Sequence, residues 1–146
     1  MPTLRQATSD DWPVVRQLLG ECGLPVSDLA ADRLDGFLVA EDSNALVGLI
    51  GLEVFGRTGL LRSLVVAGNV RSSGLGGKLV GALESAAQVA GITQLWLLTV
   101  DAERFFERQG FSIVDRESAP EQIRRTEEFS GLCPDDAFLM MKKIER

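Results

Sequence analysis

The sequence predicts an α/β domain in which helices cover both faces of a mixed sheet of about seven strands. Three features support this: segments of strand and helix character alternate, two early strands are joined by a short polar turn, and 45% of the residues are apolar. Helical connections suit parallel neighbours and short turns suit antiparallel ones, so both kinds of pairing are expected. A chain of 146 residues can bury one core, which predicts a single domain over residues 1–146.

Strand character is strongest in segments rich in β-branched and aliphatic residues and bounded by turn residues. Seven strands are expected, at residues 3–7, 37–40, 45–55, 59–67, 94–99, 111–114 and 137–142. The second and third strands are linked by residues 41–44, Glu-Asp-Ser-Asn, which is a turn composition. This pair is predicted to form a β-hairpin.

Helix character follows from apolar residues at helical spacing and from residues that cap or end a helix. In the first helix Trp12, Val15 and Leu19 recur at that spacing, Asp10 and Asp11 precede them, and Gly23 follows the helix. Five helices are expected, at residues 12–22, 26–34, 75–90, 102–109 and 120–129.

The composition excludes several classes of function. The chain has no histidine and no tyrosine, which removes histidine-dependent hydrolases and histidine-ligated metal sites. Cys22 and Cys133 form no metal or disulfide pattern, so no metal is expected. A net charge of −6 disfavours nucleic acid. There is no apolar run that could span a membrane and no signal-like N-terminus, so a cytoplasmic location is expected.

A glycine-rich loop lies between the fourth strand and the third helix, at Arg71, Ser72, Ser73, Gly74, Leu75 and Gly76. Glycine permits close backbone approach, and a helix N-terminus favours anions, so the loop suits a phosphate. It lacks the residues that a Walker loop and a dinucleotide fingerprint require. The alternative is a helix start whose glycines serve packing alone.

The loop matches the R/Q-x-x-G-x-G/A signature of the GNAT N-acetyltransferase superfamily, which the chain resembles over nearly its whole length. A second run at residues 105–111, Phe-Phe-Glu-Arg-Gln-Gly-Phe, is similar to another element of that family. The resemblance implies a GNAT-type, largely antiparallel sheet and acetyl-CoA as cofactor. It also implies a set of residues around coenzyme A: Leu64, Val65, Val66, Arg71, Ser72, Ser73, Gly74, Leu75, Gly76, Phe105 and Phe106.

Acetyl transfer to an amine needs a base for the ammonium proton and donors for the developing oxyanion. A general acid that protonates the departing thiolate is optional. The family often uses a tyrosine for this where the chain has Phe106, so no residue at that position can serve as the acid. Glu53 interrupts an apolar strand and is the candidate base; the alternative is a strand-end glutamate that faces solvent or pairs with Arg57 or Arg62. A backbone amide at Val65 or Val66 is the candidate oxyanion donor.

Arg62, Ser63 and Cys133 are candidate substrate contacts, because an arginine in an apolar strand suits a carboxylate. An ion pair between Arg62 and Glu53 is the alternative. Residues 61–63 and 119–134 resemble the ArsN-type N-acetyltransferases associated with arsenic resistance, which implies an amino-acid-like or arsenical amine. The small-molecule enzyme competes with a protein N-terminal or lysine acetyltransferase and with a non-catalytic acyl-CoA-binding module. Either a monomer or a homodimer is compatible with the sequence.

Overall fold

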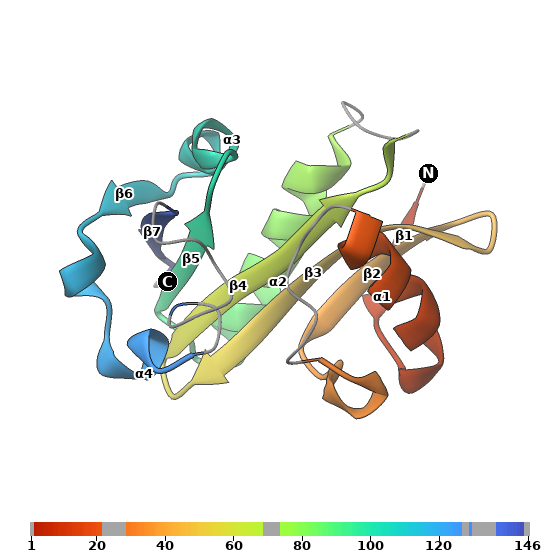
Figure 1. The fold of residues 1–146 in the computed structure, drawn as a ribbon, viewed down its shortest axis with the longest axis horizontal. Coiled ribbons are helices and arrows are strands. Elements are labelled where there is room, and N and C mark those ends of the chain that lie inside the picture. The colour runs from red at the N-terminus through yellow and green to blue at the C-terminus, as the bar shows by residue number, and fades with distance from the viewer. Residues whose placement is uncertain (1, 22–28, 69–73, 127–128, 130–136, 145–146) are drawn as a thin grey trace. The chain divides into compact units, whose positions relative to one another are not determined.

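The computed structural model describes residues 2–21, 29–68, 74–126, 129 and 137–144. Seven strands form one sheet in the order β1-β2-β3-β4-β5-β7-β6 (Figure 1). Their bounds are Thr3–Gln6, Phe37–Asp42, Ala45–Phe55, Thr58–Val66, Gln94–Thr99, Ser112–Val114 and Phe138–Lys143 for β1 to β7. The β4–β5 pair is parallel, and β1–β2, β2–β3, β5–β7 and β6–β7 are antiparallel. The predicted mixed, largely antiparallel sheet is therefore confirmed.

Four α-helices occur in the described residues, and three of them match predicted ones closely. Their bounds are Trp12–Glu21, Leu75–Val89, Glu103–Arg108 and Glu121–Arg124 for α1 to α4. α2 and α3 are each followed by a glycine in the left-handed region, with φ of +85° at Gly91 and +97° at Gly110. None of the helices in the described part of the chain is long and apolar enough to cross a membrane.

Two predicted helices need correction. In the described part of 26–34, only Ala31–Arg33 form a 3₁₀ turn, and Ala30 is extended at φ −157° and ψ 172°. In residues 120–126, which the structure describes, the helix predicted at 120–129 is the single turn α4, Glu121–Arg124. Short apolar runs without a sustained period are ambiguous, and packing elsewhere in the fold decides them.

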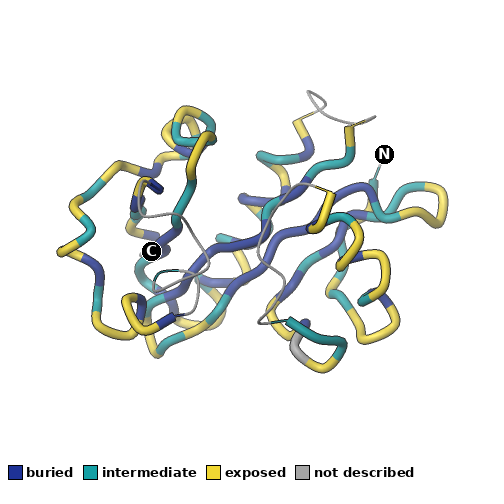
Figure 2. The backbone as a smooth tube through the Cα atoms, viewed as in Figure 1, coloured by how far each residue is buried: buried dark blue, intermediate teal, exposed yellow. Residues whose placement is uncertain are grey.

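The chain folds as two compact units, and β3, β4 and α2 each contribute residues to both. The first unit comprises residues 1–52 and 63–83, and the second comprises 53–62 and 84–146. β3 and β4 are buried along most of their length (Figure 2).

The core of the first unit lies where α1 packs on the sheet. Val15 and Leu19 of α1 have no exposed surface and contact Phe37, Val39 and Leu49 of β2 and β3. On the other face, Gly48 of β3 lies beside Leu75 and Leu79 of α2. A Cβ added to Gly48 would lie 3.1 Å from Leu79 Cδ1. Alternation along β3 therefore places α1 and α2 on opposite faces within this unit.

The core of the second unit forms between β4, β5 and β7 and the segment that contains α4. Leu60, Trp96 and Leu139 pack against Ala119 and Ile123, and all five are buried. A further link joins α2 to β7, where Lys142 Nζ donates to Glu84 Oε1 at 2.6 Å. The same ammonium donates to the carbonyl of Gln109 at the end of α3.

Candidate functional site

The C-terminal half of β4 carries the predicted pantetheine contacts and belongs to the first unit. Val65 is 3% exposed and packs into the α1 core, while Leu64 and Val66 on either side of it are half-buried. Pairing with β5 covers Thr58–Leu60. Residues 64–66 thus continue β4 beyond its stretch of pairing with β5.

Ser63 interrupts β4 with a backbone conformation that the sequence did not predict. Its φ is +62° and it is 7% exposed. A buried non-glycine residue in the left-handed region costs of order 1–3 kcal/mol and persists only where its surroundings hold it. Strained backbone of this kind clusters at active sites and ligand-binding positions.

The glycine-rich loop leads into α2 in the first unit. Arg71, Ser72 and Ser73 lie outside the described residues. Gly74 has φ +86°, and a Cβ placed on it would have no heavy atom within 4 Å. α2 starts at the next residue, Leu75, whose buried side chain faces Gly48. Amides in the first turn of a helix have no partner within the helix, so they are available to an anion.

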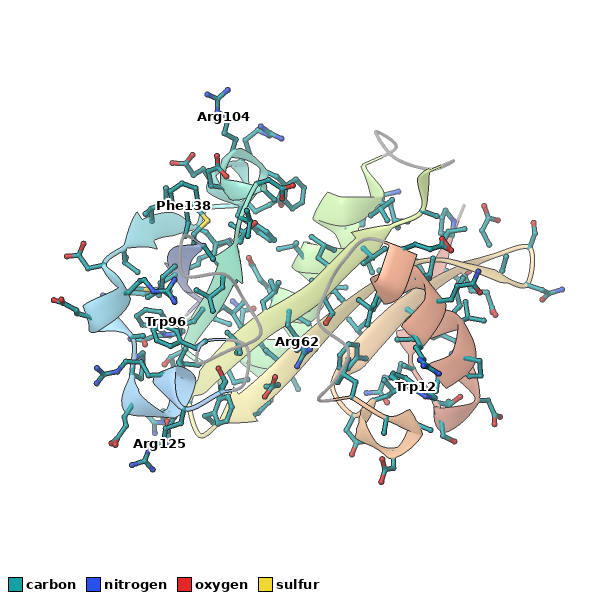
Figure 3. The ribbon with its side chains drawn as sticks, in the orientation of Figure 1. Trp12, Arg62, Trp96, Arg104, Arg125 and Phe138 are labelled. Atoms are coloured by element: carbon teal, nitrogen blue, oxygen red, sulfur yellow. The ribbon has the colours of Figure 1, made fainter. Side chains whose placement is uncertain are left out.

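Glu53 of β3 and Arg62 of β4 form an ion pair in the second unit. Figure 3 labels Arg62. Arg62 Nη1 donates to Glu53 Oε1 at 3.0 Å. The Arg62 side chain is 1% exposed and the Glu53 side chain is 33% exposed. The ion pair that was the alternative role of Arg62 is therefore present. Of its two side chains, that of Glu53 is the one accessible to solvent.

Phe105 and Phe106 lie on α3 in the second unit. Phe106 is 5% exposed and meets Phe105 and Phe111 edge to face, with ring centroids 5.1 and 5.7 Å apart. Phe105 is half-buried. Position 106 is thus an apolar packing position, which is consistent with its having no acidic hydroxyl.

Glu103 was not singled out from the sequence. One of its carboxylate oxygens, Oε2, is buried and accepts no hydrogen bond from the described residues. A glutamate in the first turn of a helix is ordinary, so only the packing of α3 reveals this oxygen.

A cavity of about 610 Å³ in the second unit lies beside β5 and β7, lined by residues that include Trp96, Val114, Asp115 and Met141. None of the predicted site residues that the structure describes is among its lining residues. The predicted residues instead divide between the units: Ser63 to Val66 and Gly74 to Gly76 in the first, and Glu53, Arg62, Phe105 and Phe106 in the second. Cys133 lies outside the described residues.

Comparison with known proteins matches residues 33–113, more than half of the chain, to the acetyltransferase (GNAT) domain. The chain is 23% identical over 152 residues to the amino-acid acetyltransferase of Neisseria meningitidis serogroup A, which covers 99% of this chain and 34% of the relative. It is 26% identical over 149 residues to the amino-acid acetyltransferase of Ralstonia nicotianae, over 97% of this chain and 32% of the relative. The chain spans about a third of the length of these curated relatives.

Two solved structures are similar over nearly the whole chain. N-acetylglutamate synthase from Neisseria gonorrhoeae, complexed with coenzyme A and N-acetyl-glutamate, has a TM-score of 0.87 at 23% identity and covers 100% of this chain and 36% of its own. Rv2747 from Mycobacterium tuberculosis, in complex with coenzyme A, has a TM-score of 0.82 at 21% identity, over 97% and 99% of the two chains. At these identities the likeness shows the fold. The match of the domain over residues 33–113 establishes that this chain belongs to the acetyltransferase (GNAT) family.

Proposed function

We propose that this chain transfers an acetyl group from acetyl-CoA to the amine of a small amino acid or analogue. The observation that carries the proposal is the family match over residues 33–113, which includes β3, β4, the glycine-rich loop, α2 and α3. The amino-acid acetyltransferases among the relatives support the substrate class.

The described residues fit coenzyme A at the start of α2. The open backbone at Gly74 and the amides of the first turn suit a pyrophosphate, held by residues 71–76. In this proposal the backbone of Leu64, Val65 and Val66 holds the pantetheine arm. The part of Phe105 and Phe106 in coenzyme A binding stays a prediction from the family resemblance. Acetyl-CoA, when bound, supplies the activated acetyl group.

Glu53 is the proposed base. An amino acid carries an ammonium group at neutral pH, and this group must lose a proton before its nitrogen can attack. Glu53 has a partly exposed carboxylate and takes that proton directly or through a water molecule. A backbone amide at Val65 or Val66 is the proposed donor to the oxygen on which negative charge develops.

Of the three substrate contacts predicted from the sequence, Ser63 and Cys133 stay proposals, whereas the side chain of Arg62 is 1% exposed and bound to Glu53. An arsenical amino-acid analogue is a narrower member of the same substrate class and stays a proposal from the resemblance of residues 61–63 and 119–134. An acetyltransferase acting on protein amines and a non-catalytic acyl-CoA-binding module are the competing functions.

The coenzyme A site is tested by Gly76→Val, because a branched side chain in the first turn of α2 blocks close approach to the backbone. Gly81→Val is the matched control: it lies in the same helix, is exposed, and has no heavy atom within 4 Å of its Cβ position. Isothermal calorimetry is expected to show that Gly76→Val loses coenzyme A binding and Gly81→Val keeps it. Equal affinity in the two variants rejects this cofactor site.

The substrate class is tested by turnover of acetyl-CoA with a panel of amines. The panel pairs each amino acid with its decarboxylated amine and includes an arsenical analogue. Preferential acetylation of amino acids supports the proposal. Acetylated proteins found by mass spectrometry after incubation with a lysate, without turnover of the panel, favour the protein acetyltransferase. Coenzyme A binding without turnover of any amine favours the binding module.

A further inference from the structure

The ion pair between Glu53 and Arg62 is unequal in its access to solvent. The two atoms Nη1 of Arg62 and Oε1 of Glu53 lie 3.0 Å apart. The guanidinium side is 1% exposed, whereas a third of the carboxylate side chain is exposed. The second oxygen of Glu53, Oε2, is not part of this contact. In this ion pair the carboxylate is therefore accessible to solvent, whereas the guanidinium is buried.

A buried guanidinium stays charged, since arginine does not lose its proton in proteins. Its desolvation is offset only if oxygen acceptors are held close to it, and a partner lost from a buried pair leaves an uncompensated charge. Glu53 Oε1 is such an acceptor, and Arg62 makes a further contact as well. The ion pair with the buried guanidinium therefore restricts the Glu53 carboxylate to one orientation.

The burial also bears on what Arg62 does. A residue that anchors a substrate carboxylate needs surface for it, and a side chain that is 1% exposed offers almost none. Glu53 has that surface. We propose that Arg62 is a positioning residue, which holds Oε1 of Glu53 so that the other oxygen faces the acceptor amine.

This inference rests on the proposed function, since it takes Glu53 as the base. One proton moves from the substrate ammonium to the free oxygen of Glu53 and leaves later to solvent through the exposed side of the carboxylate. Arg62 takes no part in that transfer except by fixing the acceptor. Fixed geometry of this kind contributes to the rate of the chemical step more than to binding.

The test compares Arg62→Met, Glu53→Gln and the double variant with the wild type. Methionine is long and apolar, so it fills the buried site without a charge. We expect Arg62→Met to lower kcat about 10-fold or more, with KM for amine and acetyl-CoA within about twofold. In the Glu53→Gln background the same substitution is expected to change kcat by less than about twofold, because two residues that act as a unit are not additive. Arg62→Lys keeps a cation and is expected to recover part of kcat.

Arg125→Met is the matched control, since it removes an arginine from an exposed pair in the same unit. Arg125 Nη2 donates to Glu121 Oε1 at 2.6 Å, and the side chains are 76% and 68% exposed. Its kcat and KM are expected to equal those of the wild type. Melting temperature and coenzyme A affinity, measured for every variant, separate loss of folding from loss of rate.

Three results overturn the proposal. A selective rise in KM for carboxylated amines in Arg62→Met, additive with Glu53→Gln, makes Arg62 a direct substrate anchor. A wild-type kcat in folded Arg62→Met shows that the ion pair serves the structure alone. A lower melting temperature in Arg62→Met and Arg62→Lys, without a loss of kcat per folded enzyme, leads to the same conclusion. Absence of turnover by the wild type with every amine is a different result, because it rejects the proposed function itself.

Discussion

The carboxyl group of Asp11, which precedes α1, has a lowered pKa. Arg5 of β1 donates to both of its oxygens at 2.9 Å, and the Thr8 amide donates to Oδ2 at 2.7 Å. The Arg5 hydrogen bonds are the largest cause that lowers the pKa of Asp11 from 3.8 to about 2, and they raise the pKa of Arg5. The Asp11 side chain is 11% exposed and that of Arg5 is 35% exposed, so solvent screens this contact in part. Asp11 thus joins the first strand to the first helix.

We predict that this contact makes stability depend on pH. Because folding lowers the pKa of Asp11, its contribution is complete above about pH 3.8 and is lost as the pH falls to about 2. Asp11→Asn is expected to lower the free energy of unfolding by about 2 kcal/mol at pH 7 and by much less near pH 2. Urea unfolding at several pH values measures this difference. The exposed neighbour Asp10→Asn is the control, and an equal effect in both variants contradicts the prediction.

At the scale of elements, β3 depends on two glycines that leave room for neighbours. A Cβ on Gly51 would lie 2.5 Å from the Phe37 ring, and one on Gly48 would lie 3.1 Å from both Leu79 Cδ1 and the Val65 carbonyl oxygen. Gly51 is paired with Phe37 across β2 and β3. The aromatic ring therefore occupies the place of the missing side chain.

We predict that Gly51→Ala lowers the free energy of unfolding by about 1–3 kcal/mol, since the Phe37 ring must move. Phe37→Leu in the same chain is expected to reduce the penalty of the added methyl group. Gly81→Ala in α2 has open space around its Cβ and is expected to stabilise by about 0.5–1 kcal/mol. Chemical denaturation measures all three. A neutral Gly51→Ala means that the ring finds another position at no cost.

Strands and glycine-ended helices could be predicted because their signals are local. The hairpin of β2 and β3 has φ of +52° and +66° at Ser43 and Asn44, in the segment whose composition predicted a turn. The helix expected over 26–34 was wrong in its described part, because a few apolar residues without caps do not fix a helix. Ser63 gave no signal, since serine is not a residue that marks a left-handed conformation within a strand.

The candidate site was predictable to a similar degree. The loop before α2 has a local signature, so its position followed from the sequence. Arg62 was expected either to contact the substrate or to pair with Glu53. The pairing could be expected because β3 and β4 follow one another in the chain. Their unequal burial was not predictable, since it depends on packing from segments distant in sequence.

For the whole molecule, the net charge of −6 opposes the approach of coenzyme A, which carries negative phosphates. We predict that the association rate constant for coenzyme A rises about twofold or more between about 0.01 and 0.15 M salt, as the Debye length falls from about 30 to 8 Å. Stopped-flow fluorescence measures this rate. Pantetheine lacks the phosphates and is expected to show no such dependence. A rate that falls with salt means that cations near the loop, such as the exposed Lys78, outweigh the total charge.

The way in which the chain is shared between its two units has a consequence for its synthesis. The first unit takes its last residues from 63–83, whereas the second needs strands that end near Lys143. About 60 residues must be added between these points, which takes roughly 3–12 seconds at about 5–20 residues per second. During that interval the nascent chain can complete the α1 core. Residues 53–62 have already been synthesised, but β5 and β7, with which they form the second unit, have not. On the ribosome, then, Glu53 and Arg62 emerge early, and the core of their own unit is completed late.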